Sequence, residues 1–446
     1  MQRRHFLRAA GLSAAGLVAG AVQAGSGSRT RTSSTTVPPV PADTGAAGRV
    51  LVIGGGMAGT TAAKYLRLWG GQKVQVTMIE RETSYVSNIM SNLVLNGGRT
   101  IAGLTYNWDR LVANYGVNRA RGDVTTIDPV ARRVFVGTTR YDYDRLVIAP
   151  GIAFDPIAGL DTDALRAQFP HAWQAGAQTT TLRDQLRAMP DGGTFVMTVP
   201  MAPYRCPPGP YERACVVADW LKRNKPRSKV LVLDENPGIT AEPESFDRAF
   251  RQTHAGVITY VPNAVVERID PATRTVHTAM GPFTGHVINP IPRQRAPELL
   301  YRNGLVNDAN PVVGERRWVN VDAVSYEHLS APGVHVIGDP ANHGQPKAGH
   351  VANMEAKVCA DAITRLLRGD VPDPSPVTNS ACYSPITFET TSWLTAVFRY
   401  NSTSRKMEVT QTATGAKVSG EAGIATKDNF EEMNKWFVQL MADTFS

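Results

Sequence analysis

The chain has 446 residues, of which 42% are hydrophobic, so it is long enough for two or three domains with sizeable cores. Its formal net charge is +8, but part of that charge lies near the N-terminus, which leaves about +4 on the region expected to fold. With so small an excess, and no basic stripe interleaved with aromatic residues, the composition argues against a nucleic-acid-binding protein.

The first residues predict an export signal. Twin arginines precede an apolar stretch of small residues, 9–21, and Ala24 offers a cleavage point. We therefore expect residues 1–24 to be a Tat signal peptide and the mature protein to be periplasmic, with an uncleaved N-terminal anchor as the alternative. Residues 25–47 are rich in Gly, Ser, Thr and Pro, which predicts a disordered linker. No later segment is long and apolar enough to span a bilayer.

A glycine-rich turn follows the first strong strand signal. The apolar run 49–53 leads into Gly54, Gly56 and Gly59, a helical stretch follows, and a second apolar strand ends on Glu80. In this dinucleotide-binding fingerprint the first glycine permits the turn, the second lets backbone approach a pyrophosphate, and the third lets helix and strand pack closely. The helix N-terminus then faces the phosphates, and Glu80 is placed to accept hydrogen bonds from ribose hydroxyls.

A second strand–helix–strand unit is expected in the middle of the chain. The apolar runs 192–199 and 228–234 flank a helical stretch at 211–223. The turn 200–212 contains several prolines, which have no N–H to donate, and it lacks the glycines that close approach of a phosphate requires. We expect the fold unit to be present and its nicotinamide nucleotide site to be lost, so that NADH is not the electron donor.

Two further segments resemble parts of the FAD-dependent pyridine nucleotide–disulfide reductase superfamily. The segment 143–151 matches a strand and turn of that superfamily and ends on Gly151. The apolar strand in 333–339 closes on Gly338 and Asp339, where the superfamily places an aspartate on the ribityl chain of FAD. The resemblance implies FAD rather than NAD, with these cofactor-binding residues: Gly54, Gly56, Gly59, Glu80, Arg81, Gly151, Gly338, Asp339 and Lys347.

The same resemblance implies the fold class and its domains. We expect an α/β protein with two Rossmann-like dinucleotide-binding domains, the FAD domain being discontinuous, and a small C-terminal α+β domain. The expected ranges are 48–159 and 301–372 for the FAD-binding domain, 160–300 for the NAD-like domain and 373–446 for the C-terminal interface domain.

The four cysteines show no C-x-x-C spacing, so thioredoxin-like, paired zinc and covalent haem motifs are absent from the sequence. Cys215 and Cys359 lie in apolar helical stretches and are expected to be buried thiols. Cys206 and Cys382 lie in segments expected to be irregular, and in an oxidising compartment they are able to pair. Composition alone favours an inert disulfide or two free thiols over a reactive pair.

The segment 205–214, which contains Cys206 and Glu212, closely resembles the active-site segment of the flavin subunit of flavocytochrome c sulfide dehydrogenase. The likeness extends over 48–446, and the sulfide:quinone reductases are the nearest sister family. Further segments carry the same resemblance: 170–173, 291–296, 334–339, 382–384 and 443–445.

The resemblance implies a redox mechanism. It makes Cys206 and Cys382 a redox-active disulfide over the flavin ring, where hydrosulfide attacks one sulfur and the released thiolate passes two electrons to the flavin. Glu212 matches a carboxylate that handles protons, although the helix dipole alone also favours an acid there. Arg205 is expected to favour the neighbouring thiolate by its charge. Lys347 is either at the flavin edge or a solvated lysine.

One position departs from the family pattern. The family attaches its flavin covalently through a cysteine, and alignment places Asn88 at that position, which predicts non-covalent FAD. The electron acceptor is implied to be a separate c-type cytochrome subunit. The last predicted helix, 429–445, has an apolar face, for which packing on the chain's own core is favoured over a cytochrome contact or a shallow membrane contact.

The leading hypothesis is therefore a periplasmic FAD enzyme that oxidises sulfide, or a related thiol or persulfide, and reduces a c-type cytochrome. The alternatives are a sulfide:quinone reductase at the membrane surface, a flavin-loaded but catalytically silent subunit, and an NAD(P)H-dependent reductase, which the proline-filled turn disfavours. The sequence leaves the sulfur donor and the oligomeric state open.

Overall fold

The chain enters its fold before the first predicted strand. The computed structural model describes residues 38–306 and 317–446, so the predicted signal peptide and most of the predicted linker lie outside the described residues. The expectation of disorder throughout 25–47 is wrong for the last residues of that range. The carbonyl of Pro41 accepts a backbone hydrogen bond of 2.8 Å, and Ala46 is fully buried. Burial of an apolar side chain and pairing of backbone groups order this end of the range.

A large sheet forms around the first predicted strand, β1 (Gly48–Ile53). It pairs in parallel with β2 (Val74–Glu80) on one side and with β9 (Arg145–Ile148) on the other. β9 pairs in parallel with β21 (Val334–Val336), so segments far apart in the sequence share one sheet. The strand order is β22–β19–β20–β21–β9–β1–β2–β5, with β5 (Asn118–Arg121), β19 (Val319–Asp322), β20 (Glu327–His328) and β22 (Ala341–Asn342).

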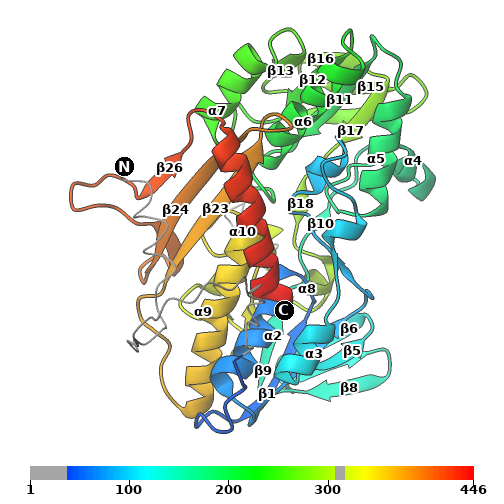
Figure 1. Ribbon diagram of the computed structural model, residues 1–446. Helices are drawn as coiled ribbons and strands as arrows, with labels where there is room; N and C mark the ends of the chain where they lie inside the picture. The colour runs from blue at the N-terminus through cyan, green and yellow to red at the C-terminus, as the bar shows by residue number, and fades with distance from the viewer. Residues whose placement is uncertain (1–37, 307–316) are drawn as a thin grey trace, which may run out of the picture. The chain divides into compact units, whose positions relative to one another are not determined.

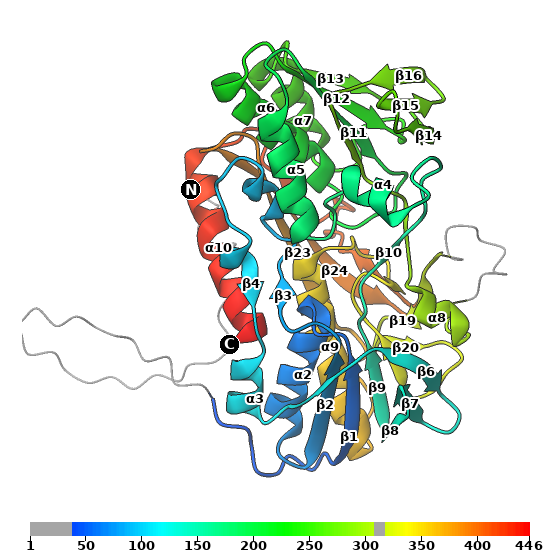
Figure 2. The ribbon, with the colours of Figure 1, turned by 90° about the vertical axis from the view of Figure 1, so that its right-hand side faces the viewer.

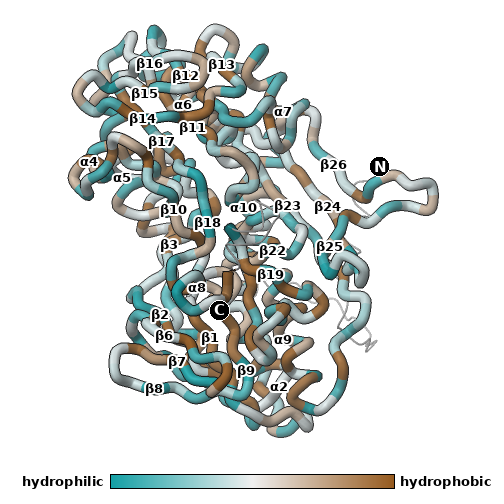
Figure 3. Tube along the Cα trace, turned by 180° about the vertical axis from the view of Figure 1, so that it is seen from behind, coloured by the Kyte–Doolittle hydropathy of each residue, from teal (hydrophilic) through white to brown (hydrophobic). Residues whose placement is uncertain are grey.

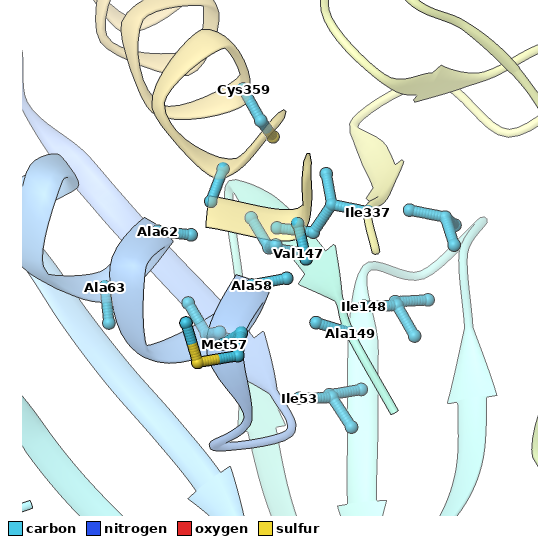
Figure 4. Close-up of a cluster of buried hydrophobic side chains, with 14 of the residues drawn as sticks. Ile53, Met57, Ala58, Ala62, Ala63, Val147, Ile148, Ala149, Ile337 and Cys359 are labelled. Atoms are coloured by element: carbon cyan, nitrogen blue, oxygen red, sulfur yellow. The ribbon is translucent and has the colours of Figure 1, made fainter. Parts of the chain in front are cut away.

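Two long helices pack beside this sheet, α2 (Met57–Gly70) and α9 (Gly349–Arg368) (Figure 1). They lie against each other because small residues such as Ala58 and Ala62 allow close approach, and both side chains are buried. Cys359 of α9 projects into the same hydrophobic cluster (Figure 4). Figure 3 shows that β1 and β9 are largely hydrophobic along their length, as expected for parallel strands covered on both faces.

A second, smaller sheet is entirely parallel in the order β13–β12–β11–β17. Its strands and the helices that accompany it are seen in the upper part of Figure 2. The strands and the helix predicted from residues 192–234 are confirmed. The elements are β11 (Thr194–Val199), β12 (Lys229–Asp234), β13 (Ile258–Val261), β17 (Val287–Pro290), α5 (Ala177–Ala188) and α6 (Gly209–Asn224).

The C-terminal region forms an antiparallel sheet and a final helix, α10 (Lys427–Phe445). Met433 and Phe437 of α10 are buried in the main core, which confirms that the apolar face of this helix packs on its own chain. No helix in the described part of the chain is both long and apolar enough to cross a bilayer. The strands are β23 (Val377–Pro385), β24 (Thr391–Asn401), β25 (Lys406–Val409) and β26 (Ser419–Glu421).

The expectation that Cys382 lies in an irregular segment is wrong, because it lies within β23 and faces Leu394 of β24. The small and polar residues of this strand gave no clear alternation, and tertiary pairing with β24 decides its conformation. The mixed α/β fold is confirmed, while the domain boundaries stay predictions, since residues 39–446 form one compact unit.

The remaining elements are short and connect or flank these sheets. They are β3 (Tyr85–Val86), β4 (Thr105–Tyr106), β6 (Val124–Asp128), β7 (Arg133–Val136), β8 (Thr139–Asp142), β10 (Ala153–Phe154), β14 (Val266–Asp270), β15 (Thr275–Thr278), β16 (Gly281–Thr284), β18 (Gln294–Arg295), α3 (Asp109–Tyr115), α4 (Asp163–Gln168), α7 (Pro243–Arg248), α8 (Glu298–Arg302), η1 (Ser91–Val94), η2 (Ala102–Leu104) and η3 (Ala249–Thr253).

Candidate active site

The glycine turn between β1 and α2 has the geometry that its sequence predicts. Gly54 has a φ of +98°, and a Cβ there would lie 2.3 Å from the carbonyl oxygen of Ala149. A Cβ on Gly59 would lie 1.8 Å from the carbonyl oxygen of Gly54, so helix and turn meet with no room for a side chain. Gly56 differs, because its added Cβ would meet only Tyr85, at 3.8 Å, and this glycine faces open space. The first turn of α2 holds no acidic residue that would compete with a bound anion.

A cavity of about 970 Å³ extends from this turn to the N-terminus of α6. Its volume is in the range typical of cofactor and small-molecule sites. Its lining residues come from segments beside the large sheet and the smaller parallel sheet, and from the C-terminal region. Of the residues singled out in the sequence, these line it: Gly54, Gly56, Glu80, Arg81, Asn88, Gly151, Cys206, Glu212, Gly338, Asp339 and Cys382.

Two carboxylates stand at the strand ends predicted to hold the cofactor. Glu80 accepts backbone hydrogen bonds from Gly55, at 2.6 Å, and Glu82, at 2.8 Å, which fixes the carboxylate beside the glycine turn. Asp339 lies 3.7 Å from the guanidinium of Arg205. Burial raises the pKa of Asp339, and the charges of Arg205 and Lys347 oppose that rise.

Lys347 does not line the cavity. Its ammonium donates to the carbonyls of Asp339, at 2.7 Å, and Ala341, at 2.8 Å, and lies 3.8 Å above the ring of Trp318. Burial lowers the pKa of Lys347 to about 8. Its own carbonyl accepts the N–H of Cys206 at 2.7 Å, so the structure gives this residue a supporting position behind the cavity wall.

Cys206 and Cys382 reach the same cavity from separate elements, and both are present as free thiols. Cys206 has a φ of +58°, and its carbonyl oxygen accepts the N–H of Gly209 at 2.9 Å. A Cβ on Gly209 would lie 2.8 Å from the sulfur of Cys206, so only glycine leaves that sulfur its space.

Burial dominates the electrostatics of Cys206. It raises the pKa well above the ordinary value, the nearby Glu212 and Cys382 raise it further, and Arg205 only partly opposes them. Arg205 therefore favours the thiolate by its charge, as the sequence predicted, but desolvation outweighs this single cation. Burial, with smaller contributions from Glu242 and Glu212, also raises the pKa of Cys382 to about 12.

Glu212 lies in the first turn of α6 and is 7% exposed. Burial raises its pKa to about 8, the hydrogen bond of 2.9 Å from Asn92 opposes that rise, and the charge of Glu242 adds to it. This carboxyl is therefore mostly protonated at neutral pH and able to donate a proton.

Three residues near the cysteines were missed in the sequence: Asn92, His350 and Glu242. His350 lies 5.9 Å from the ring of Trp436, and both residues line the cavity. Asn92 donates to Glu212 and accepts from Arg213, at 2.8 Å. His350 and Glu242 sit in no motif, so only the folded arrangement identifies them, whereas Asn92 lies in the segment whose alignment placed Asn88.

Backbone N–H groups of the turn between β11 and α6 are bound by side chains of residues that follow β12. The N–H of Met201 donates to Glu235 and the N–H of Ala202 donates to Asn236, both at 3.0 Å. Asp234, at the end of β12, accepts the hydroxyls of Tyr211, at 2.7 Å, and Tyr260, at 2.8 Å. The amides and the acid that a second dinucleotide would need are thus already engaged.

Comparison with known proteins agrees with this arrangement. Residues 48–185 match the family described as pyridine nucleotide-disulphide oxidoreductase. Residues 179–292 match the family described as sulfide dehydrogenase (flavocytochrome c) flavoprotein chain, central.

Individual relatives are more distant. The mitochondrial sulfide:quinone oxidoreductases of Dictyostelium discoideum and Mus musculus are 21% and 23% identical, over 70% and 72% of this chain and 69% and 72% of theirs. The sulfide:quinone oxidoreductase structure from Aquifex aeolicus aligns with a TM-score of 0.66 at 17% identity and covers 89% of this chain and 92% of that one.

Over residues 48–185 the chain is therefore similar to the pyridine nucleotide-disulphide oxidoreductases, and it shares the fold of the sulfide:quinone oxidoreductase structure. The chain is a flavin-dependent oxidoreductase of the sulfide-oxidising type, similar over residues 179–292 to the flavoprotein chain of sulfide dehydrogenase. This similarity implies FAD, and the site fits it: Gly56 faces open space, the N-terminus of α2 carries no acid, and the cavity runs from there to Cys206.

Replacement of Gly59 provides a test of the cofactor site. We expect Gly59→Ala to weaken FAD retention at least about tenfold, because its methyl group would force α2 away from the turn that faces the pyrophosphate. The flavin-to-protein absorbance ratio after dialysis measures this. Gly238→Ala is the matched control, since a Cβ there meets nothing within 4 Å. Equal flavin content in the two variants would contradict the assignment.

Proposed function

We propose that this chain is a periplasmic sulfide dehydrogenase that oxidises sulfide at Cys206 and Cys382 and passes the electrons through FAD to a c-type cytochrome. The observation that carries the proposal is that the two cysteines and Glu212, from separate elements, line the same cavity. The sulfur of Cys206 adjoins Gly209, whose carbonyl accepts a hydrogen bond from the same side-chain amide of Asn92 that donates to Glu212. The match of residues 179–292 to the sulfide dehydrogenase flavoprotein supports the choice of substrate.

In the proposed reaction the two cysteines begin as a disulfide. Hydrosulfide attacks one sulfur, the S–S bond breaks, and a persulfide and a thiolate form. FAD, when bound, supplies a two-electron acceptor beside this pair. Glu212, protonated at neutral pH, lies close enough to the cysteines to neutralise the negative charge that develops there.

The chain's residues also support non-covalent binding of FAD. Asn88 lines the cavity, and its side-chain oxygen accepts the N–H of Ala175 at 2.8 Å. The side chain at this position therefore makes a structural hydrogen bond. A carboxamide has no nucleophilic sulfur with which to form a thioether. We therefore propose that acid precipitation releases the flavin.

The proposed electron acceptor rests on the family that residues 179–292 match, and the proposed periplasmic location rests on the N-terminal sequence. The family of the central match is named for a flavocytochrome, which supports a cytochrome partner. The twin-arginine segment supports export to the periplasm. A sulfide:quinone reductase is the second candidate, favoured by the names of the two relatives. Reduction of a quinone that depends on added lipid would favour it over the cytochrome.

An anaerobic titration of the purified yellow protein tests the function. We expect bleaching near 450 nm at about one sulfide per flavin, release of the flavin by acid, and no rapid bleaching by NADH. The two-electron balance of the disulfide reaction sets the sulfide stoichiometry, and the engaged amides of the β11–α6 turn support the expectation for NADH. Failure of sulfide to bleach the flavin would reject the proposal and favour a catalytically silent subunit. Fast bleaching by NADH would instead indicate a working nicotinamide site.

A further inference from the structure

Glu242 is a buried carboxyl group next to the cysteine pair. It directly precedes α7, has a φ of +50°, and is 1% exposed. Its side chain does not cap the helix that it precedes. One carboxyl oxygen instead accepts the hydroxyl of Ser384 at 2.6 Å, and the other accepts the hydroxyl of Ser392. A non-glycine residue in this left-handed conformation, with its carboxyl group turned into the protein, needs a reason beyond helix capping.

The two serines place this carboxyl group beneath the strand that carries Cys382. Ser384 is two residues beyond Cys382 on β23, so the two side chains point to the same face of the sheet. Ser392 of β24 is the register partner of Ser384. The carboxyl group of Glu242 is therefore held at a site adjoining the cysteine by groups from both strands.

Ionisable groups on three elements, β26, β23 and α6, interact electrostatically with Glu242. Burial raises its pKa to about 7, the hydroxyls of Ser384 and Ser392 oppose that rise, and Glu421 of β26 adds to it. In turn, the charge of Glu242 raises the pKa of Cys382 on β23 and of Glu212 and Cys215 on α6. Glu421 is only half-buried.

We propose that Glu242 is a proton-holding residue of the cysteine pair, which takes up a proton when Cys382 becomes a thiolate and releases it when the disulfide re-forms. The proton comes from solvent and returns to it, so each thiolate charge is matched by one proton. The role of Glu242 in the catalytic cycle rests on the proposed function. The electrostatic coupling between Glu242 and Cys382 does not, because it is a property of the protein with its thiols reduced.

The test measures the reactivity of Cys382 rather than turnover. Flavin-loaded protein is reduced anaerobically with dithiothreitol, freed of reductant and alkylated with iodoacetamide between pH 5.5 and 9, and mass spectrometry follows the Cys382 peptide. Only the thiolate reacts, and ionised Glu242 disfavours the thiolate. We expect Glu242→Gln to speed alkylation at pH 8 at least about threefold, since each unit in thiol pKa changes the thiolate fraction about tenfold. An inflection near pH 7, where Glu242 ionises, is expected in the parent protein and not in this variant.

Two further variants keep the inference falsifiable. Glu244→Gln, on the exposed side of α7, is the matched control and is expected to follow the parent profile. Ser392→Ala leaves the carboxyl group in place but removes a hydrogen bond that lowers its pKa, so the inflection should move to higher pH. Identical profiles for the parent, Glu242→Gln and Ser392→Ala would overturn the inference. Because sulfide is absent, a protein that fails the sulfide titration can still pass this test, and the reverse holds as well.

Discussion

Cys206→Ser is expected to abolish reduction of the flavin by sulfide while the protein stays folded and yellow. Serine has no sulfur with which to form the disulfide that hydrosulfide attacks, so the proposed reaction has no first step. We expect the rate of sulfide-dependent bleaching to fall on the order of a thousandfold or more, which corresponds to about 4 kcal/mol in the barrier. Anaerobic stopped-flow absorbance near 450 nm measures the rate.

Cys359→Ala is the matched control for this loss. Cys359 is fully buried in α9 among core residues (Figure 4) and is not one of the residues that line the cavity. Removing its sulfur should lower stability modestly and leave the bleaching rate unchanged. If Cys206→Ser bleached as fast as Cys359→Ala, the cysteine-pair mechanism would be rejected even though the chain still oxidised sulfide.

Arg213→Ala is expected to cause the largest loss of stability. This arginine is 1% exposed, and its guanidinium donates to the side chains of Asn92 and Asn289 and to the carbonyls of His171 and Ala172. Removing the donor leaves buried acceptors without partners, which costs about 3–5 kcal/mol in unfolding free energy. Urea denaturation followed by tryptophan fluorescence measures the difference.

Arg227→Ala provides the comparison, because its guanidinium is exposed and its ion pair with Asp191, at 2.8 Å, is solvated. Such a pair contributes at most about 1 kcal/mol. Arg213→Lys separates charge from geometry, since an ammonium group keeps the charge but cannot reproduce the planar fork. Equal losses for Arg213→Ala and Arg227→Ala would show that the cluster around Arg213 tolerates unpaired acceptors.

Local sequence patterns predicted most of the elements. The apolar run 49–53 became β1, the helical stretch 211–223 became α6, and the last helix, 429–445, became α10 with small shifts at the ends. Each has a strong local signal, which is a continuous apolar run or a helical apolar period. Cys382 had no such signal, and its strand exists because β24 supplies the partner for its backbone.

The glycine turn was also predictable. A side chain at Gly54 or Gly59 would collide with backbone atoms, and the sequence motif already requires glycine at both positions. The position of Lys347 was not predictable, since the carbonyls of Asp339 and Ala341 that hold its ammonium become neighbours only when the last part of the sheet forms. Likewise Glu242 belongs to no motif, and Ser384 and Ser392 reach it only through the pairing of β23 with β24.

By itself, then, the sequence predicted the candidate residues for the chemistry: the glycines, the strand-end acids, Cys206 with Glu212, and Cys382. Only the tertiary structure decided how these groups behave. The ionisation of a thiol or a carboxyl group depends on the water, charges and hydrogen bonds around it, and burial here comes from segments far apart in the chain. That is why Arg205, the immediate neighbour of Cys206, has less effect on its thiol than the desolvation imposed by the fold.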